Sequence, residues 1–183
     1  MHFRLITLIT FVITLLACNV FAAPPIKIGA LFAVTGPAAF LGEPERNSAQ
    51  MVIDEINRSG GIKGRKLELV VYDTAGDSTK AVQLATKLIK NDKVVAIIGP
   101  STTGESMAVI PVVEKEKIPL ISCSAGIKIT EPVKKWVFKT AQNDTLAVGR
   151  IFEYLQKHKQ TLFSKLLPLV NWQILPWVCP KNN

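Results

Sequence analysis

The chain has 183 residues, a formal net charge of +8 at pH 7 and 48% hydrophobic residues. The positive surplus lies mainly near its ends, because residues 23–156 contain 17 basic and 14 acidic residues. No basic stripe interleaved with aromatic residues occurs in that central part, which argues against a nucleic-acid platform.

The N-terminal segment has the pattern of an export signal. Arg4 precedes an uncharged apolar run over residues 5–16, and Val20-Phe21-Ala22 forms a cleavage site. This predicts a secretory signal peptide over residues 1–22, cleaved after Ala22. The run is shorter than the ~20 residues of a membrane span, so an uncleaved anchor is disfavoured. Residues 15–18 also resemble a bacterial lipobox, which would place a lipid on Cys18 and tether the chain to a membrane. We therefore expect a periplasmic protein, with a membrane-tethered lipoprotein as the alternative.

Cysteines and histidines are few. The cysteines are Cys18, Cys123 and Cys179, and the histidines are His2 and His158. None forms a zinc-binding pattern, so we expect no metal and no cofactor. A Cys123–Cys179 disulfide is compatible with an oxidising compartment, but nothing in the sequence requires it.

Strand and helix patterns alternate through the central part of the chain. Apolar, β-branched runs predict strands at residues 26–33, 66–73, 94–98, 118–122 and 136–140. Apolar residues spaced by three and four predict helices at residues 43–58, from residue 77 or 78 to about 90, at 104–117 and at 144–156. This alternation predicts an α/β fold, a doubly wound parallel sheet with helices on both faces.

In such a sheet, ligands bind at the carboxyl ends of the strands. The loops expected at that edge cover residues 35–42, 73–77, 100–105, 123–127 and 141–144.

The third of these loops is the most informative. The spacing of Gly99 and Gly104 imitates a phosphate-binding P-loop, but Glu105 stands where that motif has its lysine. A carboxylate at this position would repel phosphate, so a nucleotide is disfavoured. Hydroxyls and backbone N–H groups at a helix N-terminus suit a small carboxylate instead. For Thr102 or Thr103, a role as the N-cap of the following helix is as well supported by the sequence as a contact with a ligand.

Several motifs, in the right order, resemble one protein family. They are Ile28–Ala39, Ile53–Asn57, Gly60–Arg65, Leu69–Asp73, Ile98–Pro100 and Ile118–Ser122. Over residues 27–157 the chain resembles the N-terminal lobe of the type I periplasmic binding proteins of the branched-chain amino-acid transport class. The resemblance implies a solute-binding component of an ABC importer, with an ABC permease as partner and an amino acid or analogue as ligand.

The resemblance also implies a set of binding residues. In such proteins the loop after the third strand binds the ligand carboxylate, and the loop after the fourth strand makes further contacts. An acidic residue after the fifth strand contacts the ammonium group, and the first loop provides a wall of the site. The corresponding residues here are Ser101, Thr102 and Thr103; Ser124 and Gly126; Asp144; and Phe40 and Leu41. Asp144 is more readily explained as a helix cap, and packing is an alternative role for Phe40 and Leu41.

We expect three segments: the signal peptide (1–22), the α/β lobe (23–157) and an atypical tail (158–183). The tail has three prolines, two tryptophans and no acidic residue, so it is either out-of-frame sequence or an apolar segment that packs on the lobe. A family member would need a second lobe to close on its ligand, so binding by this chain is expected to be weak or absent. Alternatives are a sensing or interaction protein built on the same lobe or, less favoured, an exported hydrolytic enzyme using Asp73, Asp77 or Asp144.

Overall fold

A computed structural model describes residues 23–157, and the signal peptide and the tail expected from the sequence lie outside these residues. Within this part, a five-stranded sheet has the order β2-β1-β3-β4-β5. Every neighbouring pair of strands in it is parallel. The strands are β1 (Ile26–Phe32), β2 (Leu67–Asp73), β3 (Ala96–Ile98), β4 (Leu120–Ser122) and β5 (Val137–Lys139).

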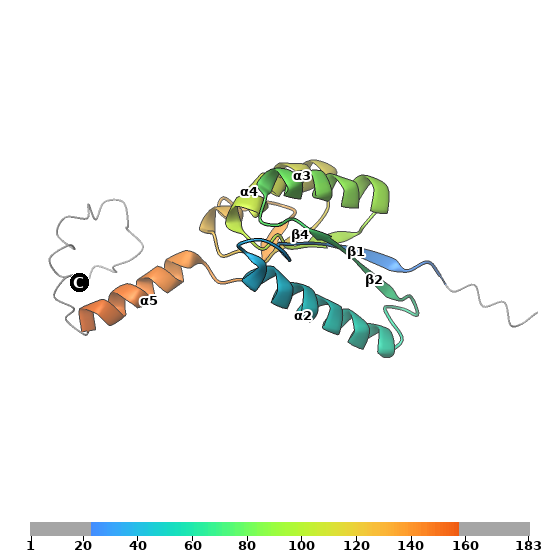
Figure 1. Ribbon diagram of the computed structural model, residues 1–183, viewed down its shortest axis with the longest axis horizontal. Helices are drawn as coiled ribbons and strands as arrows, with labels where there is room; N and C mark the ends of the chain where they lie inside the picture. The colour runs from blue at the N-terminus through green and yellow to red at the C-terminus, as the bar shows by residue number, and fades with distance from the viewer. Residues whose placement is uncertain (1–22, 158–183) are drawn as a thin grey trace, which may run out of the picture.

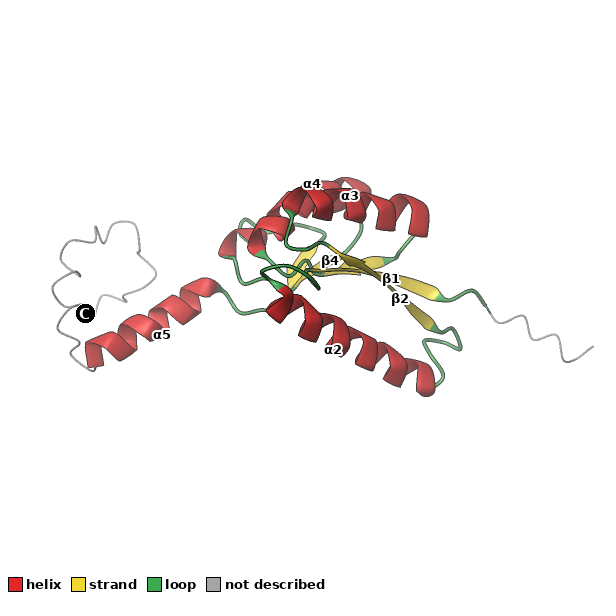
Figure 2. Ribbon diagram, viewed as in Figure 1, coloured by secondary structure: helices red, strands yellow, loops and turns green. Residues whose placement is uncertain are grey.

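Helices cover both faces of the sheet, as the alternation predicts. Helix α2 (Ala39–Arg58) lies on one face, and α3 (Ser78–Lys87) and α4 (Thr103–Glu116) lie together on the other (Figures 1 and 2). Helix α3 continues into a π-helical turn, η1 (Leu88–Asp92), and a 3₁₀ turn, η2 (Ile127–Ile129), precedes β5. The expected doubly wound α/β lobe is therefore confirmed.

The main core lies between the sheet and the pair α3 and α4. Ile97, Leu120 and Val137 occupy one register row across β3, β4 and β5, and all three are buried. Gly29 continues this row on β1 and leaves room for Leu88, since a Cβ there would lie 2.8 Å from Leu88 Cδ1. This apolar layer fixes α4 against β4, and hence the loops at the carboxyl ends of the strands.

The opposite face is covered unevenly. The adjacent register row runs from Ala30 through Ile98 and Ile121 to Phe138. Ala30 is fully buried under α2, Ile98 and Ile121 are half-buried, and Phe138 is 53% exposed. Helix α2 therefore covers β1 and β2 and leaves the far part of this face open.

Element boundaries differ from those expected at a few points. Helix α2 begins at Ala39 rather than Glu43, because its first turn packs directly on the end of β1. Gly42 makes this possible, since a Cβ there would lie 2.2 Å from the carbonyl oxygen of Ala33. The three-residue strands β3, β4 and β5 are also shorter than expected, although Val95 still donates a hydrogen bond to Lys27 O at 2.9 Å.

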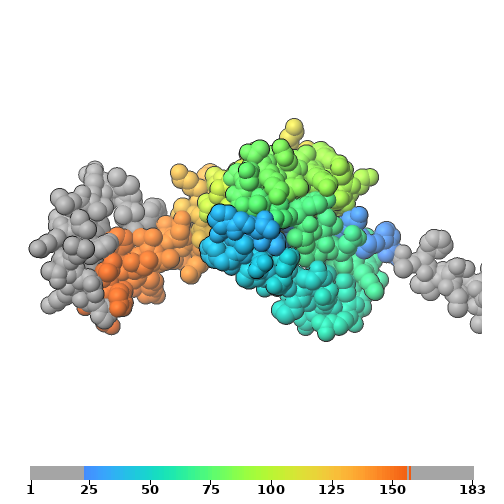
Figure 3. Space-filling view, in the orientation of Figure 1, coloured from blue at the N-terminus to red at the C-terminus, as the bar shows by residue number. Residues whose placement is uncertain are grey.

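Helix α5 (Asp144–Lys157) follows β5 and extends away from the sheet (Figures 1 and 3). Leu146 and Ile151 on it are 61% and 56% exposed. Among the described residues, no helix combines the length and the apolar character that crossing a membrane requires.

Candidate functional site

The N-terminus of α4 lies at the carboxyl edge of the sheet and is capped by its own sequence. Thr102 is the N-cap, and Glu105 completes a capping box. Glu105 Oε2 accepts hydrogen bonds from Thr102 N at 3.1 Å and Thr102 Oγ1 at 2.6 Å, and Glu105 N donates to Thr102 Oγ1 at 3.4 Å. Glu105 is fully buried, so it belongs to the helix cap and is not available as a surface acid.

Two backbone donors remain at this helix end. The N–H groups of Thr103 and Gly104 are in the first turn and donate to no acceptor among the described residues. Both residues are exposed. Because the positive end of the helix dipole coincides with these donors, the position favours a negatively charged group.

The loop after β4 lies directly beside this helix end. A Cβ added at Gly126 would come within 2.4 Å of Thr103 Cγ2 and 3.0 Å of Thr103 Oγ1, so the Thr103 side chain packs on Gly126. The N–H groups of Ala125 and Gly126 also have no acceptor among the described residues. We call these four residues, Thr103, Gly104, Ala125 and Gly126, the amide rim: a hydroxyl and four backbone donors on the helix end and the loop beside it. Thr103, Gly104 and Ala125 are exposed, and Gly126 is buried against the Thr103 side chain.

Beneath the amide rim lies a buried serine cluster. Ser106 Oγ lies 2.8 Å from Ser122 Oγ and 2.9 Å from Ser124 Oγ. Ser124 Oγ also donates to Pro100 O at 3.1 Å, and Ser124 N donates to Ser122 Oγ at 3.1 Å. The cluster joins α4, β4 and the two loops, and its hydroxyls are satisfied internally. Ser124 therefore supports the loop, while its own hydroxyl faces inward.

Ser101 is likewise used inside the lobe. Its hydroxyl accepts a hydrogen bond from Ala33 N at 3.1 Å and donates to Glu45 Oε2 on α2. Burial of Glu45 raises the pKa of its carboxyl group; the hydrogen bond from Ser101 opposes this shift, and the nearby negative charge of Glu105 adds to it. Ser101 thus connects α2 and β1 to the loop before α4 and is only 4% exposed.

The remaining residues of the expected site lie at its borders. Asp144 is exposed in the first turn of α5, and its carboxylate accepts a hydrogen bond from Thr145 N at 2.9 Å. Asp144 N donates to Ala125 O at 3.2 Å, which places the start of α5 beside the amide rim. Leu41 and Phe40 project from the first turn of α2 and are 39% and 74% exposed. Their contact with a ligand stays a prediction, as it does for the other expected site residues.

Sequence reasoning missed several residues that build this edge. Glu45, Ser106, Ser122 and Lys139 had no role in the expected site, although each hydrogen-bonds to or within the loops that form it. A hydroxyl within an otherwise apolar helix or strand, as at Ser106 and Ser122, was the only available signal. The Glu45 and Lys139 contacts depend on tertiary structure and had no signal.

The acids considered for a hydrolytic enzyme have structural partners. Asp73 Oδ1 accepts hydrogen bonds from Val34 N, Thr35 N and Ala75 N at 2.9 to 3.1 Å, and Oδ2 accepts one from Thr35 Oγ1 at 2.5 Å. Burial works to raise the pKa of Asp73, but these hydrogen bonds outweigh it and lower the pKa. Asp77 is the N-cap of α3, accepting from Lys80 N at 2.8 Å, which decides between Asp77 and Ser78, the two residues at which the sequence places the start of this helix.

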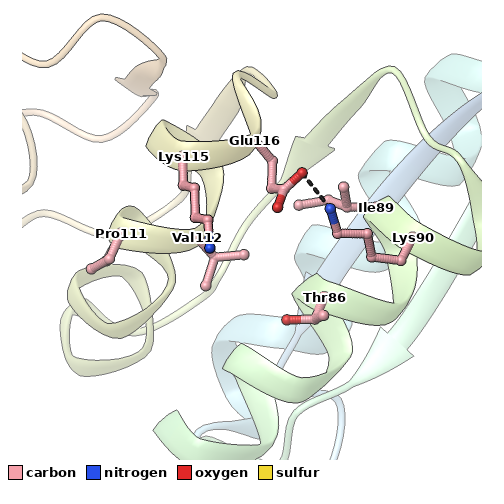
Figure 4. A pocket seen from close by; sticks show the side chains of 7 residues that line it. All are labelled: Thr86, Ile89, Lys90, Pro111, Val112, Lys115 and Glu116. Carbon is pink, nitrogen blue, oxygen red and sulfur yellow. Dashed lines mark hydrogen bonds and ion pairs between the residues drawn. The ribbon is translucent and has the colours of Figure 1, made fainter.

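A pocket of about 400 Å³ lies elsewhere, between α3 with η1 and α4 (Figure 4). An ion pair between Lys90 Nζ and Glu116 Oε2, 2.5 Å long, crosses this pocket. Glu116 is the last residue of α4, so the pair lies at the opposite end of this helix from the amide rim. No group of three or more potential metal-ligating side chains occurs within residues 23–157. The unpaired backbone donors of the amide rim are the feature that suits a small carboxylate.

Comparison with known proteins identifies the family. A family model described as "Periplasmic binding protein" matches residues 25–164, which is most of the chain. The Leucine-, isoleucine-, valine-, threonine-, and alanine-binding protein of Pseudomonas aeruginosa is 36% identical over 126 residues, covering 68% of this chain and 34% of that protein. The Leu/Ile/Val-binding protein of Escherichia coli K12 is 35% identical over 113 residues, covering 62% of this chain and 30% of that protein. The chain thus spans about a third of the length of these curated relatives.

Solved structures share the fold. The branched-chain amino acid transporter substrate binding protein LivJ from Streptococcus pneumoniae, in complex with isoleucine, matches with a TM-score of 0.64 and 34% identity, covering 66% of this chain and 35% of that chain. A periplasmic binding protein type 1 from Bordetella pertussis matches with a TM-score of 0.65 and 32% identity, covering 73% of this chain and 38% of that chain. The resemblance to branched-chain amino acid binding proteins that the motifs indicated is confirmed.

Proposed function

This chain belongs to the periplasmic binding protein family, and we propose that it supplies the N-terminal ligand-binding lobe of an extracytoplasmic solute receptor. The ligand is an amino acid of the branched-chain type or a similar small carboxylate. The receptor delivers it to an ABC permease. The names of the relatives, which are binding proteins for leucine, isoleucine and valine, support this assignment.

One observation carries the proposal: the amide rim offers donors with no competing acceptor. The N–H groups of Thr103 and Gly104 and the hydroxyl of Thr103 are exposed at a helix N-terminus, beside the N–H groups of Ala125 and Gly126. A carboxylate accepts several hydrogen bonds at once, and hydrogen bonds to a charged group are about twice as strong as neutral ones. The rim therefore suits the α-carboxylate of an amino acid.

The remaining ligand groups have fewer partners on this lobe. Asp144 N donates to Ala125 O of the rim, and the Asp144 side chain is exposed. Its carboxylate is therefore our candidate partner for the ammonium group. Leu41 and Phe40 supply exposed apolar surface on the first turn of α2. These contacts form one wall of a site, so we expect a dissociation constant on the order of millimolar, which corresponds to about 4 kcal/mol.

The test is an amide NMR titration of the full chain with L-leucine and, separately, with 3-methylbutylamine, which lacks the carboxylate. Leucine should shift the signals of Thr103, Gly104, Ala125 and Gly126, and the amine should not. Thr103→Ala should weaken leucine binding. Thr86→Ala, the same change on the exposed surface of α3, serves as the control. Equal shifts with both compounds, or none at the rim, would contradict the proposal.

A further inference from the structure

Lys139 lies at the end of β5 and reaches under the loop that carries half of the amide rim. In the sheet register it is opposite Ser122, the last residue of β4. Its Nζ donates hydrogen bonds to Ala125 O at 2.8 Å and Gly126 O at 3.4 Å. These two hydrogen bonds hold the ammonium group against the loop, and Lys139 is half-buried there.

These contacts orient the donors of the rim. Ala125 O also accepts from Asp144 N at 3.2 Å, and Gly126 O accepts from Ile129 N at 3.2 Å. The Ala125–Gly126 peptide is trans, so its N–H points away from its carbonyl. Because Lys139 and Asp144 N fix the carbonyl of Ala125 on one side, the N–H of Gly126 is directed to the other side of the loop.

The charge of Lys139 is not neutralised by an ion pair in the described part of the chain. The ion pairs there join Lys90 to Glu116 and Arg150 to Glu153. The Lys139 partners are neutral carbonyls, which it polarises. A positive charge behind a polarised peptide makes the N–H of that peptide a stronger donor toward an anion.

We propose that Lys139 is a positioning residue for carboxylate binding: it fixes the Ala125–Gly126 peptide and adds positive charge behind its donor without touching the ligand. This inference rests on the proposed function for its binding consequence. Its structural consequence, the placement of the loop, holds in the ligand-free protein as well.

The test compares Lys139→Met, Lys139→Arg and the control Lys128→Met in the full chain. Lys128 lies in the turn after the same loop and is exposed, so its replacement removes an equal charge from the same region. In ligand-free amide NMR spectra, Lys139→Met should shift the signals of Ala125, Gly126 and Ile127 far more than Lys128→Met does. In Lys139→Arg, most of these signals should return to their positions in the spectrum of the parent protein.

Leucine titrations then measure the effect on binding. Lys139→Met should raise the leucine dissociation constant at least fivefold, Lys139→Arg should stay within about twofold of the parent, and Lys128→Met should be unchanged. Unaltered loop signals in Lys139→Met, or leucine binding within twofold of the parent, would overturn the inference. If the parent itself shows no leucine-dependent shift, the proposed function fails, and the ligand-free spectra still decide whether Lys139 positions the loop.

Discussion

Gly126→Ala should separate ligand binding from folding. The backbone of Gly126 has φ −55° and ψ 127°, which alanine adopts without strain. The atoms nearest to the added methyl group belong to the Thr103 side chain, with Cγ2 at 2.4 Å and Oγ1 at 3.0 Å. Thr103 is exposed, so its side chain can rotate away, and the hydroxyl then leaves the amide rim.

The magnitudes follow from these contacts. Replacing glycine by alanine at a compatible position stabilises a protein by about 0.4–1 kcal/mol through the unfolded chain. Displacing a surface side chain offsets this gain, so the free energy of unfolding should stay within about 1 kcal/mol of the parent value. Loss of one hydrogen bond to a charged group costs about 1.5–3 kcal/mol, and leucine affinity should therefore fall at least tenfold.

Gly99→Ala is the matched comparison for folding. Gly99 has φ +92°, and a Cβ there would lie 2.1 Å from the backbone oxygen of Leu31, which cannot rotate away. This substitution should lower the free energy of unfolding by about 3 kcal/mol or more, from backbone strain and overpacking together.

Urea unfolding followed by circular dichroism gives the stabilities, and amide NMR titration with leucine gives the affinities. A third variant, Thr103→Ala with Gly126→Ala, removes both clashing atoms, so the stability effects of the two changes should not add. The reasoning is refuted if Gly126→Ala lowers the unfolding midpoint as much as Gly99→Ala, or if it leaves leucine binding unchanged.

Three further predictions concern titratable groups. Burial raises the pKa of Glu45 above 4.5, so ionisation of this carboxyl group opposes folding. Glu45→Gln should therefore gain stability relative to the parent as the pH rises above 4.5. If the urea midpoints of Glu45→Gln and the parent differ by the same amount at every pH between 4 and 8, the argument fails. The pKa of Asp73 lies below 3.8, so its contribution is present above pH 3.8 and lost as the pH falls through the folded pKa. Asp73→Asn should therefore be less stable than the parent at pH 7, by a margin that narrows below pH 3.8, and a margin independent of pH would contradict the argument. Burial and the charge of Glu45 raise the pKa of the Cys123 thiol to about 11, so its alkylation by iodoacetamide should stay slow at pH 8 and accelerate as the pH approaches 11; rapid reaction at pH 8 would refute that assignment.

The sequence predicted the fold well because the fold depends on local periodicity. The strands that carry Ile97, Leu120 and Val137, and the start of a helix at Asp77 or Ser78, follow from local spacing, whereas the register that aligns the three residues comes from the structure. It also predicted that the candidate site loops lie at one edge of the sheet, since parallel strands bring their carboxyl ends to the same edge, and the binding site there stays a prediction. The roles of individual residues could not be predicted. The hydroxyl of Ser101 is held between Ala33 N and Glu45, a contact across 56 residues of sequence that no local pattern indicates, and a ligand contact of Ser101 stays a prediction.

Glu105 shows how the local and tertiary arguments combine. The sequence marks it as the residue that disfavours phosphate at a P-loop-like turn, and the structure shows why a carboxylate stands there. Its Oε2 caps Thr102, so the helix end satisfies part of its own donor set and leaves Thr103 N and Gly104 N free. The price is a fully buried acid whose Oε1 has no hydrogen-bond partner among the described residues. A negative charge inside the cap weakens the attraction of the helix end for any anion.

The positive charge of Lys139 acts on the opposite side of the same rim. Held by the carbonyls of Ala125 and Gly126, its ammonium group counters the negative potential of Glu105 along the amide rim. A carboxylate can accept hydrogen bonds from these donors while bringing only one negative charge close to Glu105. A phosphate, with up to two charges, would meet greater repulsion and no lysine within the loop. As part of the proposed function, we expect the balance of these two charges, more than the helix end by itself, to favour an amino-acid carboxylate over a phosphate at this site.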